Sequence, residues 1–544
     1  MIKRQFNRLA ESEVKAGNLI PTVETLPYAI NPLEYFGRLS DNGRNKNCIM
    51  FESASIVQKY GERSIGSASP CLKVTGKNEN FEIVPLNETG KRFIQFLNGD
   101  LDFCDDVKYE ENMIYGKLKP KRGISSEDER LKLTNHTEIL RKIVFKFKPL
   151  SKPFVPYCGL FGAISYDFID QFEDLTKNEN DLTNDPDYVL YYLDNLFFID
   201  HKENRTYFVA NALVTGNDNV LDECRNKIEH YKNIALAENS LMANFNNGRN
   251  ITNEIQSKIN KIITTDTDKE EFIKLVGEIK EHIKAGDVYQ AVLSRTIISE
   301  FNGESFEVYK RLRKLNPSPY MFYINYGGGV LLGASPETCL KVEGDKEKIV
   351  EIRPIAGTKP RGLINNKVDF DLDSKYEAEL KIDKKEISEH IMLVDLARND
   401  VAKISKPGSR YVDETFAVEK YSHVQHLVSN VVGTLKPNLD ALHAYTATMN
   451  MGTLTGAPKV EAMKLLRNYE KNKRGFYGGS VCYMTPSGDF DSAIVIRSIN
   501  IKNNKAYVRA GAGIVYDSNP ESEFIETERK SFACLKALEA GDLI

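Results

Sequence analysis

Short apolar runs separated by polar turns dominate the first part of the chain. The runs 48–51, 81–85 and 188–199 have strand length and are rich in aromatic and aliphatic residues, and a polar turn at 200–204 follows the last of them. We therefore predict that residues 1–215 form a region of alternating short strands and helices.

The amino-acid composition of the chain changes after this region. Residues 216–270 are polar and rich in Asn, Lys and Glu, which predicts a linker or a solvated helical excursion. Beyond them Phe272 and Val276 begin an apolar series at helical spacing, and Gly286 follows as a typical helix end. This helix opens a third predicted region, 271–544.

The third region alternates predicted strands with predicted helices. A long helix fits residues 375–398, and a last helix is expected to begin near Pro520, after the capping residues Ser518 and Asn519. The predicted strands are 291–298, 321–326, 330–333, 348–353 and 506–510. Such a mixture of strands and helices indicates an α+β or α/β protein, and periodicity alone names no topology.

Composition and charge narrow the function classes. The chain has 544 residues, and its 73 basic and 77 acidic side chains leave a net charge of -4. That balance provides no electrostatic basis for binding nucleic acid or an acidic membrane surface. No apolar run approaches the roughly 18 residues of a membrane-spanning helix, and the N-terminus lacks the apolar stretch of a secretory signal.

The cysteines and the missing motifs add further exclusions. The eight cysteines are scattered without a CxxC pair, which is typical of reduced thiols and predicts a cytoplasmic protein. The chain has no P-loop, HExxH or GxSxG motif, which disfavours an ATPase, a zinc hydrolase or a serine hydrolase. No cysteine stands in a nucleophile setting with a partner histidine, so we do not expect the chain to hydrolyse glutamine itself.

Two pairs of acidic residues stand at helical spacing. Glu386 and Glu389 lie three apart, as do Glu523 and Glu526, so each pair shares one helix face. Two such helices offer carboxylates to one hard cation, and magnesium suits a site that keeps room for water and an anionic substrate. Most glutamate pairs on helices are solvated surface residues, but the apolar stretch 391–396 predicts burial around Glu389.

Two glycine-containing segments and one arginine are further candidates for ligand contact. Residues 355–358 and 511–513 each follow a predicted strand, and glycine turns of this kind let backbone N–H groups approach a carboxylate, although ordinary tight turns have the same pattern. Arg497 lies inside the apolar run 494–499, and a buried guanidinium requires an anion, which is either an internal carboxylate or a substrate.

Several long motifs in order resemble the chorismate-utilising enzyme family. They are GDVYQAVLSR (286–295), RPIAGTKPRG (353–362), EISEHIMLVDLARND (386–400), GTLTGAPKVEAM (452–463), IVIRS (494–498) and SEFIETERK (522–530). FESASI (51–56) and GLFGAISYD (159–167) resemble the N-terminal part of the same family. The resemblance covers nearly the whole chain, and it implies an α+β fold of the α/β sandwich type with a central cleft.

The resemblance also implies roles for particular residues. Glu389 and Glu526 would hold Mg²⁺, with Glu386 and Glu523 as neighbours in the acidic cluster. His426 would assist the elimination step, and Gln290 and Thr453 would complete the catalytic set. Contacts to chorismate are implied for Gly357, Thr358, Tyr477, Arg497, Gly511, Ala512, Gly513 and Lys459.

Two positions discriminate among the family's activities. Isochorismate and salicylate synthases resemble one another in having Lys where this chain has Gln290, and a glutamine cannot activate water as a base. Aminodeoxychorismate synthases of the common type have a nucleophilic Lys where this chain has Ala356. Both positions favour the anthranilate synthase members; aminodeoxychorismate synthase component I and a catalytically inactive tryptophan sensor remain the alternatives.

The resemblance extends to regulation and assembly. It implies a site for the inhibitor tryptophan formed by Glu52, Ser53, Pro319, Tyr320, Met321, Val481, Tyr483 and Asp491. Some feedback-sensitive members have Cys where this chain has Ala493. Ammonia is expected from a separate glutamine amidotransferase (glutaminase) subunit, in a heterotetramer of two large and two small subunits.

Overall fold

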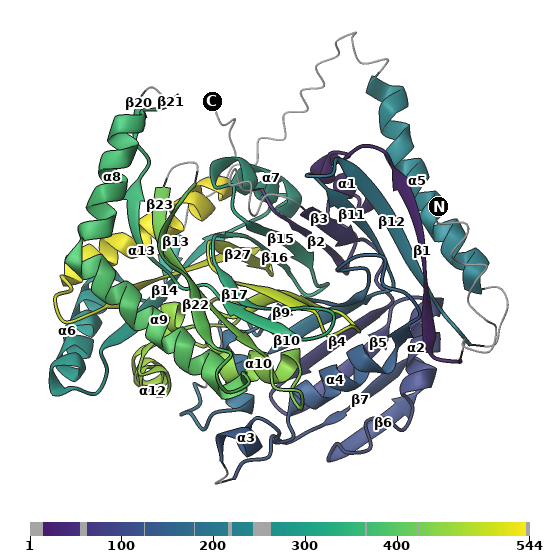
Figure 1. Ribbon diagram of the computed structural model, residues 1–544, viewed down its shortest axis with the longest axis horizontal. Coiled ribbons are helices and arrows are strands. Elements are labelled where there is room, and N and C mark those ends of the chain that lie inside the picture. The colour runs from purple at the N-terminus through teal and green to yellow at the C-terminus, as the bar shows by residue number, and fades with distance from the viewer. Residues whose placement is uncertain are drawn as a thin grey trace.

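Two large stacked β-sheets form the body of the protein (Figure 1). The computed structural model describes residues 15–54, 63–123, 126–178, 180–215, 220–242, 263–364, 367–421 and 424–539. Within these ranges each of the two sheets has 13 strands, and a separate hairpin pairs β20 (Leu363–Ile364) with β21 (Lys367–Val368). The predicted α+β class is confirmed.

The first sheet, sheet A, interleaves strands from both ends of the chain. Its order is β13-β14-β28-β27-β16-β15-β2-β3-β11-β12-β1-β8, with β24 paired to β14. The bounds are β1 Asn18–Leu26, β2 Cys48–Glu52, β3 Arg63–Ser67, β8 Lys148–Pro149, β11 Asn195–Asp200, β12 Arg205–Leu213, β13 Ile263–Thr265, β14 Gln290–Glu300, β15 Tyr320–Asn325, β16 Val330–Ser335, β24 Gly456–Ala457, β27 Ser498–Lys502 and β28 Lys505–Ile514. Because β2 pairs with β15, one sheet spans the first and the third predicted regions.

Sheet B is built in the same way. Its order is β19-β23-β18-β17-β26-β25-β9-β10-β4-β5-β7-β6, with β22 paired to β23. The bounds are β4 Leu72–Lys77, β5 Asn80–Pro85, β6 Asp106–Glu110, β7 Met113–Lys117, β9 Gly159–Ile164, β10 Tyr188–Leu193, β17 Thr338–Glu343, β18 Ile349–Ile352, β19 Ile355–Pro360, β22 Tyr411–Lys420, β23 Val424–Thr434, β25 Ser480–Met484 and β26 Phe490–Ile494. Here β9 pairs with β25, so this sheet also joins the two regions.

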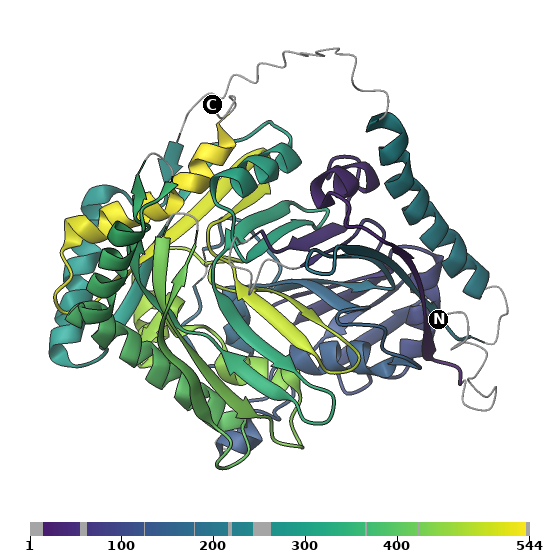
Figure 2. The ribbon, with the colours of Figure 1, turned by 45° about the horizontal axis from the view of Figure 1, so that its top comes forward.

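Helices cover the outer faces and the two ends of the sandwich. Helices α6, α8, α9 and α13 gather at one end, and α5 lies at the opposite end (Figures 1 and 2). The bounds are α1 Pro32–Leu39, α2 Glu88–Leu97, α3 Glu127–Arg130, α4 His136–Lys146, α5 Val220–Met242, α6 Lys269–Ala285, α7 Ser305–Leu315, α8 Phe370–Ile382, α9 Lys384–Ile404, α10 Ala441–Thr448, α11 Gly452–Thr455, α12 Lys459–Tyr469 and α13 Pro520–Leu538. No helix in the described ranges is long and apolar enough to cross a membrane.

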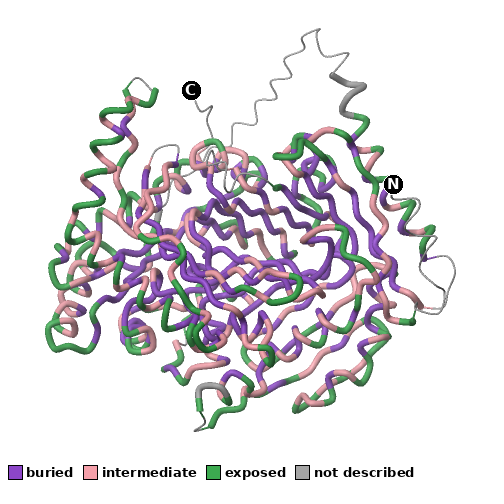
Figure 3. The backbone as a smooth tube through the Cα atoms, viewed as in Figure 1, coloured by how far each residue is buried: buried purple, intermediate pink, exposed green. Residues whose placement is uncertain are grey.

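The sandwich holds its apolar core in layers. Ile49 and Ile324 of sheet A meet Phe161 and Val189 of sheet B in the layer between the sheets. A second layer lies between sheet B and helices such as α4 and α10, and a third lies between sheet A and α1, α5, α7 and α13. Figure 3 accordingly shows buried strands in the middle and exposed helix surfaces at the periphery. All eight cysteines are free thiols.

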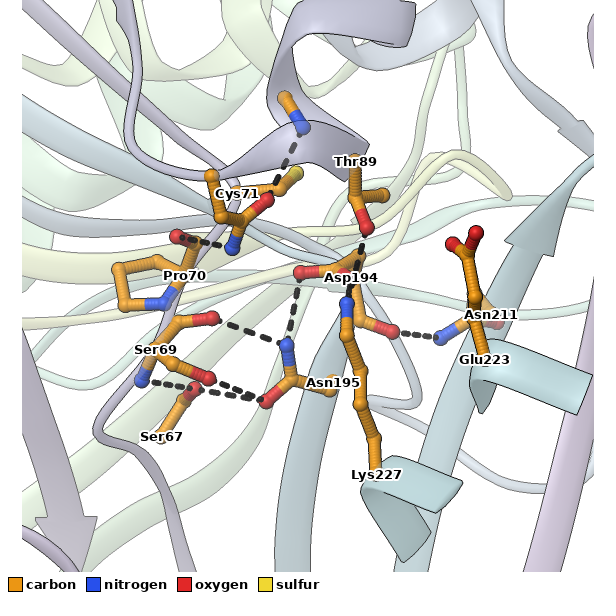
Figure 4. A network of polar contacts seen from close by, with 12 residues as sticks. Ser67, Ser69, Pro70, Cys71, Thr89, Asp194, Asn195, Asn211, Glu223 and Lys227 are labelled. Atoms are coloured by element: carbon orange, nitrogen blue, oxygen red, sulfur yellow. Dashed lines mark hydrogen bonds and ion pairs between the residues drawn. The ribbon is translucent and has the colours of Figure 1, made fainter. Parts of the chain in front are cut away.

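A buried polar cluster marks the point where the chain passes from one sheet to the other (Figure 4). Asp194 joins β10 of sheet B to β11 of sheet A and is fully buried. Lys227 of α5 donates to Asp194 Oδ2 at 2.8 Å, and Asn195 Nδ2 donates to Asp194 Oδ1 at 2.8 Å. Burying a carboxylate costs much free energy unless it is paired and hydrogen-bonded, so these contacts hold α5 against the crossover between the sheets.

Several predicted elements need correction. The long helix expected at 375–398 is two helices, because Asp383 ends α8 and caps α9 by accepting from the backbone of Lys385 and Glu386. The predicted glycine turn at 511–513 is part of strand β28. Within 216–270, helix α5 packs on sheet A through apolar residues such as Ile228, while 216–219 and 243–262 lie outside the described residues.

Candidate active site

A cavity of about 530 Å³ lies between helices α9 and α13 and the strands β14, β19 and β28. The lining includes most residues for which the sequence predicted a catalytic, substrate or metal role. They are Gln290, Gly357, Thr358, Glu389, His426, Thr453, Tyr477, Arg497, Gly511, Gly513 and Glu526. Segments more than 200 residues apart in the chain therefore meet in one cavity, although their roles remain predictions.

The two acidic pairs face this cavity from two helices. The cap at Asp383 starts α9 so that Glu386 and Glu389 lie on its cavity side, and Asn519 caps α13 one turn before Glu523. Burial and the neighbouring Glu389 charge raise the pKa of Glu386 above its usual range. Burial likewise raises the pKa of Glu523, and Ser518 opposes this rise.

These carboxylates have few partners within the protein. Glu389 accepts a hydrogen bond of 2.8 Å from Gln290 Nε2, and Glu526 pairs with Lys530 at 2.6 Å. Among the described residues, no group of three or more His, Cys, Asp or Glu side chains is placed so that it could hold a metal ion by itself. Carboxylates on two helices around an open cavity, with incomplete charge compensation, fit a hard cation that also binds water and substrate.

The burial predicted for α9 is only half correct. Leu393 is buried, but Ile391 on the opposite face is 47% exposed. The helix is therefore amphipathic, and its apolar stretch does not enclose Glu389, which is half-buried at the cavity wall.

Arg497 supplies an available positive charge. Its backbone has a left-handed φ of 50°, and its carbonyl accepts from the Ala334 N–H at 3.0 Å. In the described part of the chain no carboxylate lies within 4.0 Å of its guanidinium. Burial lowers the pKa of Arg497, as expected for a desolvated cation that has no carboxylate beside it in the described part of the chain.

The tautomer of His426 follows from its backbone contact. Its Nδ1 lies 2.9 Å from the carbonyl oxygen of Gly357 and 3.1 Å from the Thr358 hydroxyl. A carbonyl oxygen only accepts, so Nδ1 carries the hydrogen and the neutral ring keeps Nε2 as an acceptor. Burial lowers the pKa of His426, and this favours the neutral form. Gly357, with φ 69°, sits at a bulge of β19 that aims its carbonyl at the ring.

Glu337 is among the cavity residues that the sequence reasoning missed. Glu337 lies in the turn between β16 and β17, lines the cavity, and has a buried Oε1 without a hydrogen-bond partner among the described residues. Burial raises its pKa to about 7, and Thr453 and Lys530 oppose the rise in part. The available signal was an acidic residue between two apolar strands, where a charge is either solvated or functional.

Two predicted contacts lie elsewhere. Lys459 does not line the cavity, because its ammonium pairs with Asp400 at 2.5 Å and donates to the Thr448 carbonyl at 2.7 Å. Ala512 is fully buried, and its side chain packs in the apolar cluster that α6 forms with β28. Its neighbours Ala510, Gly511 and Gly513 line the cavity instead.

A second cavity of about 250 Å³ opens between the two sheets. It is lined by every residue of the predicted effector site: Glu52, Ser53, Pro319, Tyr320, Met321, Val481, Tyr483 and Asp491. Glu52 Oε1 accepts from Tyr309 at 2.6 Å and from Arg313 at 2.8 Å, while its buried Oε2 has no partner in the described chain. Arg63 also lines this cavity, so both an acid and a base stand beside apolar walls.

Comparison with known proteins identifies the family. A family model described as chorismate binding enzyme matches residues 106–536. The chain belongs to this family. Anthranilate synthase component 1 of Vibrio cholerae is 38% identical over 515 residues, which cover 94% of this chain and 95% of that protein.

Solved structures agree with this placement. Anthranilate synthase component I from Streptococcus pneumoniae matches with a TM-score of 0.64 and 28% identity, covering 87% of this chain and 92% of that one. The menaquinone-specific isochorismate synthase of Escherichia coli matches with a TM-score of 0.59 at 15% identity, covering 99% of both chains, and this likeness concerns the fold alone.

The two discriminating positions of this chorismate-binding enzyme both face the cavity. Gln290 directs its amide N–H toward Glu389. Ala356 presents only a methyl group in β19. Neither side chain can act as a general base or as an amine nucleophile.

Proposed function

We propose that this chain is the chorismate-converting component of anthranilate synthase, which turns chorismate and ammonia into anthranilate and pyruvate in the first step of tryptophan biosynthesis. The observation that carries the proposal is the 38% identity to anthranilate synthase component 1 over 94% of the chain. Gln290 and Ala356 support the same activity, since they provide neither the base nor the amine that the neighbouring activities use.

Magnesium is the proposed cofactor. Glu389 and Glu526 would hold it, with Glu386 and Glu523 completing the acidic surround. When bound, the metal would neutralise a carboxylate of the substrate and stabilise charge that develops in the reaction. Burial raises the pKa of Glu386 and Glu523, and the charges of Glu389 and Glu526 add to the rise; a bound cation would favour the ionised carboxylates against both effects.

Chorismate is a dicarboxylate, and the cavity offers groups that bind anions. Arg497 would pair with one carboxylate, and the Tyr477 hydroxyl would donate to it. Gly511 and Gly513 leave the backbone of β28 open to the substrate, because neither has a side chain. These contacts would place the ring between His426 and Glu337.

The proton transfers can be assigned to two titratable groups of the cavity, Glu337 and His426. Ammonia attacks C2 of the ring while the C4 hydroxyl leaves as water, and the protonated Glu337 carboxyl would supply the proton that this hydroxyl needs. In the second step the C2 proton is removed and the C3–O bond breaks, and the departing enolpyruvate takes up one proton at its methylene carbon to become pyruvate. The free Nε2 of neutral His426 would accept that proton.

The ammonia would come from a glutamine amidotransferase subunit. The word component in the relatives' names implies a partner component. We further propose a heterotetramer of two large and two small subunits, and a cytoplasmic location that the eight free cysteines support.

The second cavity is the proposed site for tryptophan as feedback inhibitor. The unpartnered Glu52 Oε2 would accept from the α-amino group, and Arg63 would bind the α-carboxylate. The aromatic and aliphatic walls formed by residues such as Tyr483 and Met321 suit a large indole ring.

The decisive experiment uses the purified chain with chorismate, magnesium and ammonium, and follows anthranilate fluorescence together with pyruvate. Equal amounts of both products, lost in Glu389→Ala and in Glu526→Ala, would support the reaction and the metal site. Chorismate consumption without pyruvate would instead indicate aminodeoxychorismate or isochorismate synthesis. Tryptophan binding without any turnover would indicate an inactive sensor.

A further inference from the structure

One turn of the chain stands between the two cavities. Pro336 and Glu337 line the catalytic cavity, and the strand after this turn, β17, reaches the effector cavity at Lys341 and Glu343. Strand β16, which precedes the turn, pairs with β15, where Tyr320 is opposite Ser335. Strand β17, which follows it, pairs with β26, where Ala493 is opposite Thr338.

Hydrogen bonds tie the turn to these neighbours. Glu337 donates its backbone N–H to Ser335 Oγ at 3.3 Å, and its carbonyl accepts from the Ile494 N–H at 3.0 Å. The Tyr320 hydroxyl and Thr338 Oγ1 lie 3.1 Å apart. Tyr320 and Ala493 both line the effector cavity, so the two residues that flank the Pro336–Glu337 turn, Ser335 and Thr338, are each paired with an effector-cavity residue.

Thr338 is the side-chain link in this arrangement. The Tyr320 hydroxyl donates its single hydrogen to Asp491 Oδ1 at 3.4 Å. The same hydroxyl can therefore only accept in its contact with Thr338, so the Thr338 hydroxyl is the donor there. Thr338 is buried and lines neither cavity. The pairing of β17 with β26 is irregular between Thr338 and Leu340, so the regular ladder is interrupted just beyond this link.

We infer that Thr338 is a positioning residue through which occupancy of the effector cavity sets the placement of Glu337 in the catalytic cavity. The inference rests on the proposed function of both cavities. A ligand in the effector cavity contacts Tyr320 and Ala493, and a displacement of either is transmitted to the peptide on one side of Glu337.

The end of strand β16 before this turn is also hydrogen-bonded to Arg497, the proposed substrate-binding cation. Ala334, one residue before Ser335, donates its backbone N–H to the Arg497 carbonyl at 3.0 Å. Arg497 follows the effector-lining Ala493 by four residues along the chain. A shift of this turn therefore moves both the proposed acid and the proposed anion-binding group, which weakens chorismate binding and slows its conversion together.

Equilibrium binding tests the inference, because coupling between two ligands is reciprocal. The tryptophan dissociation constant of the full chain is measured by calorimetry with magnesium, with and without saturating chorismate, and without ammonium so that no amination occurs. The variants are Thr338→Val, which keeps the shape but loses the hydroxyl, and Thr338→Ser, which keeps the hydroxyl. Thermal unfolding confirms that each variant is folded.

We expect chorismate to weaken tryptophan binding to the wild type by about 5- to 150-fold. Thr338→Val lowers that ratio by about fivefold, the effect of losing one ordinary hydrogen bond, and Thr338→Ser preserves it. A wild-type ratio in Thr338→Val, or an equal fall in Thr338→Ser, overturns the inference and leaves both sites intact. A wild type that binds no tryptophan at all refutes the proposed effector site instead, and the inference falls with it.

Discussion

Gln290 donates a hydrogen bond of 2.8 Å from its Nε2 to Oε1 of Glu389. The strand β14 thus holds a carboxylate of helix α9 in place from the opposite wall of the cavity. Gly513 of β28 packs against this pair, since a Cβ there would lie 2.7 Å from Gln290 Nε2 and 3.7 Å from Glu389 Oε1. The position of the proposed metal ligand therefore depends on a residue without a side chain.

The first prediction concerns this packing. Gly513→Ala is expected to displace the Gln290 amide and to lower kcat/KM for chorismate by about 10- to 100-fold, the range for losing a partner that orients a metal ligand. The measurement is ammonium-dependent anthranilate formation across a magnesium titration, in which the variant needs more metal for half-maximal rate.

A matched substitution controls for the added methyl group. Gly277 lies in helix α6, where a Cβ meets nothing within 4 Å, so Gly277→Ala leaves activity unchanged and raises stability by about 0.5–1 kcal/mol. Unchanged magnesium dependence in Gly513→Ala would show that Gln290 does not orient Glu389.

The second prediction concerns Glu337 and pH. Burial raises its pKa from 4.5 to about 7, so the folded chain binds this proton more tightly than the unfolded chain does. The associated stability is complete below about pH 4.5 and is lost as pH rises through about 7. Glu337→Gln removes this dependence, so the Tm of the variant minus that of the wild type should increase between about pH 5 and about pH 8.

The size of this effect has an upper bound. A shift of that size corresponds to about 3 kcal/mol, and water entering the cavity reduces it. A Tm difference that stays constant over the pH range would mean that the carboxyl titrates normally and cannot serve as the proposed acid near neutral pH.

The third prediction concerns the effector cavity. Glu52→Gln removes the negative charge whose Oε2 has no partner in the described chain, and we expect tryptophan affinity to fall by about 10- to 100-fold. Chorismate conversion without tryptophan should be unchanged, because Glu52 does not line the catalytic cavity. Calorimetry and the fluorescence assay measure the two effects separately.

Glu343 provides the comparison within the same cavity. Its carboxylate already pairs with Lys341 at 3.0 Å and its side chain is 38% exposed, so Glu343→Gln should change tryptophan affinity by less than about threefold. Equal losses in both variants would indicate a general charge effect instead of a contact to the ligand.

The fourth prediction concerns the crossover between the sheets. Lys227→Met leaves the buried Asp194 carboxylate without its cation, which should cost about 3–5 kcal/mol of stability and lower the Tm. The exposed pair of Lys91 with Glu88 is the control, because Lys91→Met should cost less than about 1 kcal/mol. Adding Asp194→Asn to Lys227→Met should recover part of the loss; no recovery would mean that packing of the lysine stem causes it.

Local patterns in the sequence were sufficient for much of the secondary structure. Strands such as β15 and β18 appear where apolar runs predicted them, and helix α6 ends at Gly286 with a left-handed φ of 88°. Asn519 caps α13 as predicted, because capping depends on neighbours within one turn. Spacing of three residues likewise placed the glutamate pairs on common helix faces.

The sequence by itself determined which residue types meet at the two cavities, since its long motifs resemble the family to which the chain belongs. Only the tertiary structure decided that Lys459 forms an ion pair with Asp400, that β28 continues through Gly513, and that Glu337 is a buried acid. Burial and ion pairing depend on strands distant in the chain, and local patterns carry no information about such partners. The interleaving of both predicted regions within each sheet is decided in the same way, because strand order depends on long-range pairing.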